Sequence, residues 1–129
     1  MSGKSIGIFE IGYDRTEVFV DKDSYDGSFT FLPKEGYSQI VIGLANNSWM
    51  DILQIVLHEA FEFAFAKSGC RFDKSNDLGN DHSGYMFFFN HPQFSNACGI
   101  SADFLYNVNS KLYSEWCKVH KKKVKGKQE

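Results

Sequence analysis

Hydrophobic residues are densest between Ser48 and Gly69, in the segment SWMDILQIVLHEAFEFAFAKSG. This segment predicts one helix over 48–68, with Ser48 as its N-cap and Asp51 in the capping-box position. Gly69 is expected to adopt the left-handed conformation that ends the helix. Because apolar side chains occupy most of its circumference, we expect a central helix that its neighbours bury on nearly all sides.

A second apolar stripe predicts another long helix, over about 92–119. Pro92, after Asn90 and His91, suits the first turn of this helix. Gly99 is unfavourable inside a helix by about 1 kcal/mol relative to Ala, so a helix that begins only at Ser101 is the alternative. The residues of the stripe alternate between spacings of three and four: Phe94, Cys98, Ser101, Leu105, Val108, Leu112 and Trp116.

The first third of the chain alternates short apolar runs with turn residues, a pattern typical of β-structure. Strands are predicted over 5–13, 16–21, 28–32 and 39–44, and the bulky run at 85–89 is compatible with another. The segment between Gly69 and this run is predicted to be a polar surface loop. The short turns favour an antiparallel or mixed sheet. The expected fold class is therefore α+β, with a small N-terminal sheet packed on the central helix and a second long helix beside it.

Charge divides the 129-residue chain into two unequal parts. Residues 1–117, the length of one domain, contain 8 Lys and Arg against 15 Asp and Glu. Residues 118–129 contain 6 Lys against one Glu, and we expect them to form a basic, disordered tail. The acidic body is unsuited to bind phosphates, so only the Lys-rich tail is expected to contact nucleic acid.

Cysteine usage and hydropathy indicate the compartment. The three cysteines lack framework spacing, which favours a reduced, cytoplasmic protein. No apolar run is long enough for a membrane helix, and no secretion signal is visible at the N-terminus.

Three polar residues interrupt the predicted central helix: His58, Glu59 and Glu62. A buried carboxylate without a partner is costly, so these side chains should be paired, bound to a metal, or facing a cleft. His58 and Glu62 are one turn apart on the same face, and an imidazole with a carboxylate can hold zinc. His91 and His82 are candidates for a further ligand. Glu59 could then take a proton from a metal-bound water.

The segment DILQIVLHEAFEFAF, preceded by a strand and followed by a His-led helix, resembles the small zincin-like proteins of phages and prophages. The resemblance covers roughly 38–116. It implies that His58, Glu62 and His91 bind zinc and that Glu59 is the acid/base of a hydrolase of peptide or amide bonds. HEAFE departs from the H-E-x-x-H pattern because it lacks the second His. A carboxylate in that position would reduce the Lewis acidity of the metal.

Other interpretations of these residues remain open. Lys67 or Arg71 could pair with one of the glutamates, which would make the cluster structural. The chain would then be a non-catalytic module that binds a host protein through its acidic, aromatic-rich surface. A second possible zinc site would use Cys70, His82, His91 and Cys98, but these residues lack paired C-x-x-C spacing. A calcium loop after Asp73 would lack the required glycine and glutamate. A protein partner or a peptide substrate is expected, and the sequence does not indicate the oligomeric state.

Overall fold

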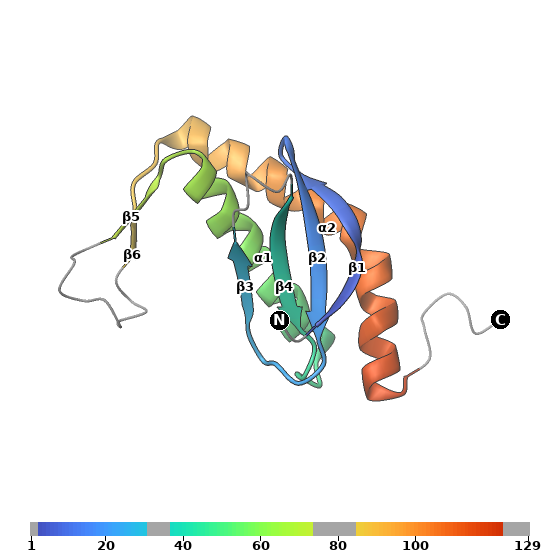
Figure 1. Ribbon diagram of the computed structural model, residues 1–129. Coiled ribbons are helices and arrows are strands. Elements are labelled where there is room, and N and C mark those ends of the chain that lie inside the picture. Colours follow the sequence, from blue (N-terminus) through green and yellow to red (C-terminus); the bar gives the residue numbers. More distant parts are fainter. Residues whose placement is uncertain (1–2, 31–36, 74–84, 123–129) are drawn as a thin grey trace.

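The computed structural model describes residues 3–30, 37–73 and 85–122, and its elements follow the predicted order (Figure 1). Along the chain, four strands precede the first helix, and the two strands of a short second sheet follow it, before the second helix. The elements are β1 (Lys4–Ile11), β2 (Asp14–Asp21), β3 (Gly27–Thr30), β4 (Ser38–Gly43), α1 (Trp49–Lys67), β5 (Arg71–Asp73), β6 (Tyr85–Phe87) and α2 (His91–His120). The α+β fold class is confirmed.

The four-stranded sheet is mixed, with strand order β1-β2-β4-β3. β2 and β4 are parallel, whereas the β1–β2 and β3–β4 pairs are antiparallel. The chain therefore leaves β2, forms the edge strand β3, and returns to place β4 between them.

Gly43 makes this crossing feasible. Its N–H donates to the carbonyl of Asp26 at 2.8 Å. A Cβ at this position would lie 2.3 Å from the carbonyl oxygen of Ser24, so the segment that leads into β3 can cross β4 only over a glycine.

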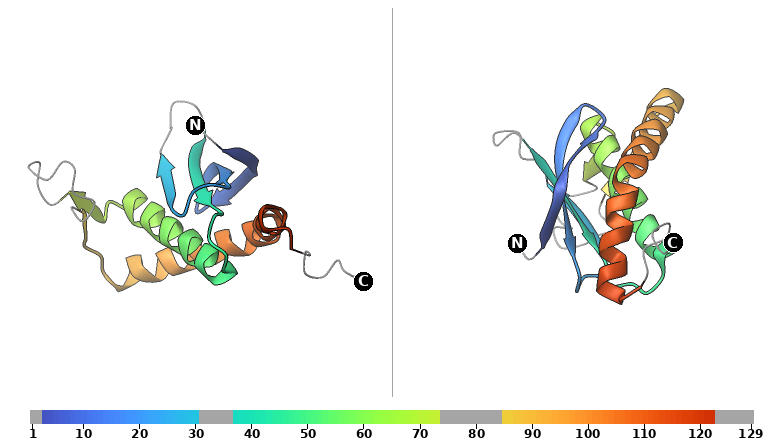
Figure 2. Two further views of the ribbon diagram at one scale, coloured as in Figure 1. Left: turned by 90° about the horizontal axis from the view of Figure 1, so that it is seen from below. Right: turned by 90° about the vertical axis from the view of Figure 1, so that its right-hand side faces the viewer.

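Both helices lie on one face of the sheet, as the side view in Figure 2 shows. α1 packs on β3 and β4, α2 packs on β1, and the two helices pack against each other. One main core joins the sheet and the two helices. Each of them contributes large, fully buried side chains to it: Val18, Ile40, Ile52, Phe63, Phe104 and Leu112.

α1 is the predicted central helix, and Ile52, Val56 and Phe63 are buried in the core. Its burial is less complete than expected, because His58 and Met50 are exposed. Ser48 precedes the helix without a side-chain capping bond, whereas Gly69 has the predicted positive φ, 76°.

α2 is continuous through Gly99, so it does not begin at Ser101. Asn90 and Gln93 form a capping box at its start, and the proline lies in its first turn. In the N-terminal half, the buried stripe is displaced from the predicted one. The buried positions there are Ala97, Ser101, Phe104 and Val108, whereas Phe94 is exposed.

α2 also continues into the segment predicted as a tail. The helix ends at His120, and Lys121 follows in the left-handed conformation with φ 57°. The Trp116 indole donates to the carbonyl of Asn46 at 2.9 Å, which fixes this end on the loop before α1. The remainder of the predicted tail, 123–129, lies outside the described residues.

The two-stranded sheet of β5 and β6 corrects the prediction of a loop directly after Gly69. Arg71–Asp73 was expected to be loop, but it forms β5 and pairs with β6. A strand of three residues, here RFD, is too short to show a periodicity of its own. The run at 85–89 is confirmed as a strand over Tyr85–Phe87, and 74–84 lie outside the described residues.

Within the described ranges, neither helix combines the length and the hydropathy that a membrane span requires.

Candidate functional site

A cavity of about 740 Å³ opens between the start of β3 and α1; we call it the Glu59 cleft. One wall comes from the segment that enters β3 and from the loop before α1: Tyr25, Asp26, Gly27 and Asn46. The other wall is one face of α1, where helical periodicity aligns five side chains: Asp51, Gln54, Ile55, His58 and Glu59. The amide of Asn46 donates to the carbonyl of Tyr25 at 3.4 Å within the first wall.

Glu59 is the deepest charged residue of the cleft, with 7% of its surface exposed. It is buried because α1 approaches the backbone of β3 at a glycine. A Cβ on Gly27 would lie 2.8 Å from Cγ of Glu59 and equally close to Ile55. Within the described ranges, the Glu59 carboxyl forms no hydrogen bond or ion pair, so it is left open to the cleft.

The surroundings of Glu59 favour its neutral form. Burial is the main cause that raises its pKa from 4.5 to about 7. His58 and Arg71 act in the opposite direction, and the carboxylates of Glu62 and Asp26 add to the rise. A carboxyl group that titrates near neutral pH in a cleft is typical of acid/base sites.

His58 and Glu62 lie beside Glu59 on the same face, as their spacing predicts. Nε2 of His58 is 2.5 Å from Oε2 of Glu62. The other oxygen of Glu62 is 3.7 Å from Arg71, one of the two basic residues considered as partners. The second, Lys67, instead pairs with Asp14 at 3.3 Å. Glu62 is therefore partly neutralised by the protein itself.

His58 and Glu62 are the two residues of the predicted zinc site that lie together in the structure. An imidazole and a carboxylate are ligands that zinc accepts, and His58 and Glu62 provide one of each. Among the described residues, no group of three His, Cys, Asp or Glu side chains could hold a metal ion. The described residues therefore offer at most two ligands, His58 and Glu62, where catalytic zinc sites usually have three from the protein.

Neither candidate for the third ligand joins this pair in the described structure. His91 is the exposed first residue of α2, and it forms no ligand group with His58 and Glu62. His82 lies outside the described residues. The alternative set around Cys70 and Cys98 is likewise not assembled within the described ranges, and Cys70 is buried.

The sequence interpretation missed the acidic rim of the cleft. Asp51 and Gln54 precede His58 by seven and four positions, so helical spacing alone could have placed them on its face. Asp26 and Gly27 lie between the strands predicted over 16–21 and 28–32. Their position in the wall depends on the path by which the segment before β3 crosses β4, which no local pattern encodes.

No protein-family model, curated protein or solved structure matches this chain. The function is therefore argued from the cleft itself.

Proposed function

We propose that the Glu59 cleft is the active site of a zincin-like hydrolase that acts on peptide or amide bonds. In this proposal Glu59 is the general base, and His58 and Glu62 would hold a zinc ion. The observation that carries the proposal is the buried Glu59 carboxyl, which opens onto a cavity of about 740 Å³ beside an imidazole–carboxylate pair.

The side chains of the chain have distinct roles in this proposal. Glu59 is held in place by its close approach to Gly27, and its free oxygens can accept a proton from the attacking water. Arg71 orients Glu62, and Glu62 orients the His58 ring. Zinc, when bound, would supply Lewis-acid chemistry.

The test combines metal analysis with a hydrolysis assay on protein purified without an affinity tag. We expect about one zinc per chain, and its loss in His58→Ala. With a quenched-fluorescence peptide mixture as substrate, Glu59→Gln should retain the metal but lose at least about 100-fold in turnover.

Asp103→Asn is the matched control, because it removes an exposed carboxylate outside the cleft and should change neither value. A folded protein without metal, whose hydrolysis is absent or insensitive to Glu59→Gln, would contradict the proposal.

A second candidate function is a non-catalytic module that binds a protein partner. It is favoured by an apolar surface around β6 and the start of α2, where four large side chains are 41–58% exposed: Met86, Phe88, Phe89 and Phe94. The ring of Phe89 stacks on both Phe65 and Phe94. Soluble proteins use exposed aromatic patches mainly for binding. A folded, metal-free protein in which His58→Ala and Glu59→Gln change neither stability nor hydrolysis would support this function.

A further inference from the structure

We propose that the Glu59 cleft binds an organic cation, specifically the ammonium or guanidinium group of a basic ligand such as a lysine or arginine side chain. This inference deepens the proposed function, because it names the group that a substrate presents to the cleft. It does not require zinc or hydrolysis, so the two can be tested apart.

Apart from the imidazole of His58, the ionisable side chains that line the cleft are carboxyl groups. Asp26 from the entry to β3, Asp51 from the first turn of α1, and Glu59 all contribute carboxyl groups. None of the three side chains forms an ion pair within the described ranges, and no Lys or Arg is among the described lining residues. A cavity lined by one sign of charge attracts ligands of the opposite sign.

The Glu59 carboxyl is independent evidence for a ligand. It is more than nine-tenths buried, it lines the cavity, and no described residue bonds to it. Buried carboxyl groups are normally hydrogen-bonded or paired. Gly27 lies against the Glu59 side chain, and Glu59 lines the cavity, so a ligand in the cleft can reach its carboxyl group.

The arrangement suits an organic cation better than a directly coordinated metal ion. The three carboxyl groups do not form a group that could hold a metal, and they surround a cavity of about 740 Å³. An ammonium group on a flexible stem donates three hydrogen bonds and can reach carboxylates that are spread apart. Ile55 offers apolar surface to such a stem, and the Tyr25 ring, in a residue 64% exposed, offers an aromatic face to the charge.

The experiment measures binding of four fluorescein-labelled pentapeptides by anisotropy, with EDTA present to remove metal. The peptides share an alanine background and carry Lys, Arg, norleucine or Glu at the centre. Norleucine has the lysine stem without the ammonium group. We expect the Lys or Arg peptide to bind at least about tenfold more tightly than the norleucine peptide, and the Glu peptide to bind least.

Variants then locate the site. Asp51→Asn, Asp26→Asn and Glu59→Gln should each weaken binding of the basic peptide several-fold, whereas Asp103→Asn should not. Spermidine serves as a competitor: displacement of the peptide by spermidine at lower concentration than by free lysine amide identifies a polyamine as the source of the cation. The reverse order identifies a basic side chain, and either result supports the cation site.

Equal binding of the Lys and norleucine peptides, or equal losses in Asp103→Asn and the cleft variants, would overturn the inference. Hydrolysis without a preference for basic residues would overturn it and leave the proposed function standing. Selective binding of the basic peptides without hydrolysis or zinc would support the cation site and overturn the proposed hydrolase.

Discussion

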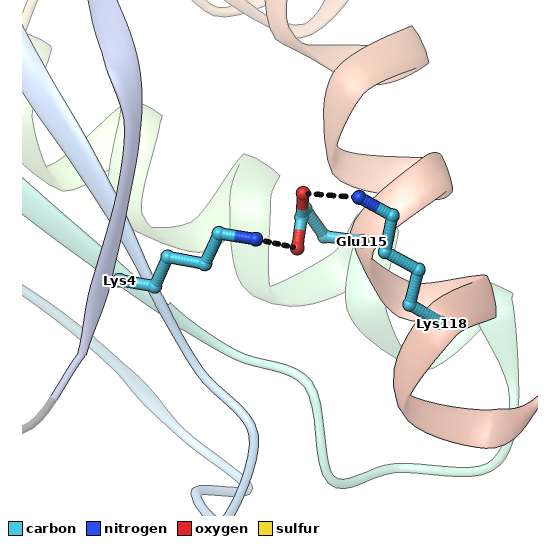
Figure 3. Close-up of polar contacts among 3 residues, drawn as sticks. All are labelled: Lys4, Glu115 and Lys118. Carbon is cyan, nitrogen blue, oxygen red and sulfur yellow. Dashed lines mark hydrogen bonds and ion pairs between the residues drawn. The ribbon is translucent and has the colours of Figure 1, made fainter.

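Two buried glutamates in this protein have opposite surroundings. Glu59 on α1 and Glu115 on α2 are 7% and 8% exposed, respectively. Lys4 Nζ lies 3.0 Å from one oxygen of Glu115, and Lys118 Nζ lies 3.3 Å from the other (Figure 3). Glu59 has no such partner within the described ranges. Equal burial therefore does not imply an equal role.

The pKa values of the two carboxyl groups move in opposite directions. Burial alone would raise the pKa of Glu115, but the hydrogen bonds and charges of Lys4 and Lys118 outweigh burial and lower it below 4.5. At Glu59 burial prevails, and its pKa rises to about 7. Glu115 ties β1 to α2 and has both oxygens occupied, as expected of a structural residue. Within the described ranges the oxygens of Glu59 have no protein partner, which costs stability and fits the proposed ligand site.

The largest effect should come from Gly43→Ala, which removes the crossing that builds the wall of the Glu59 cleft. Its Cβ would lie 2.3 Å and 2.5 Å from two backbone oxygens, which cannot move without displacing the entry to β3. We expect the free energy of unfolding to fall by about 3 kcal/mol or more in urea denaturation.

Gly99→Ala is the control for this substitution, because nothing lies within 4 Å of the added Cβ and the position is helical. It should increase stability by about 0.5–1 kcal/mol. Equal losses in the two variants would contradict the crossing.

The next effect concerns Glu59→Gln, which replaces the carboxyl by its neutral isostere. Because the pKa of Glu59 is higher in the folded protein than in the unfolded chain, folding stability is retained below pH 4.5 and falls as the pH rises towards about 7. At about pH 8 the variant should be more stable than the wild type by roughly 1–3 kcal/mol, after allowance for solvent that reaches the carboxyl from the cleft.

Urea denaturation at about pH 4 and about pH 8 checks this prediction, since the two proteins should differ little at the lower pH. A variant less stable than the wild type at the higher pH would show that Glu59 has a stabilising partner, and the contrast with Glu115 would fail.

The smallest effect should come from Glu115→Gln, and it should have the opposite sign. Because its pKa is lowered in the folded protein, Glu115 adds stability above pH 4.5 and loses it as the pH falls through the folded pKa. The two lysines are 63% and 64% exposed, so we expect a loss of only about 1 kcal/mol at neutral pH. The loss should shrink in urea denaturation at about pH 3, and a loss independent of pH would contradict the ion pairs.

The sequence predicted what local periodicity encodes. Both helices, the short apolar strand β4, and the shared face of His58 and Glu62 follow from spacing within single segments. The left-handed Gly69 follows from residue type, whereas the capping bond expected at Ser48 is not formed and the capping box at Asn90 and Gln93 was not predicted.

Features that depend on distant contacts were not predictable. The parallel pairing of β2 with β4 depends on the passage over Gly43, and the exposed outer face of α1 depends on the absence of a third layer within the described structure. Lys4 and Glu115 are 111 positions apart, so no local pattern announces their pair. The sequence placed a carboxyl in an apolar helix at Glu59, but only the approach to Gly27 shows that it is buried and open to a cleft.

Site-resolved titration of the side-chain carboxyl carbons by NMR tests the central contrast most directly, with Glu59→Gln and Glu115→Gln used for assignment. We expect Glu59 to titrate near pH 7 and Glu115 to titrate below pH 4.5 in the same sample. A Glu59 midpoint at or below 4.5 would mean that the carboxyl has a cationic partner within the protein, and the open cleft would no longer be its explanation.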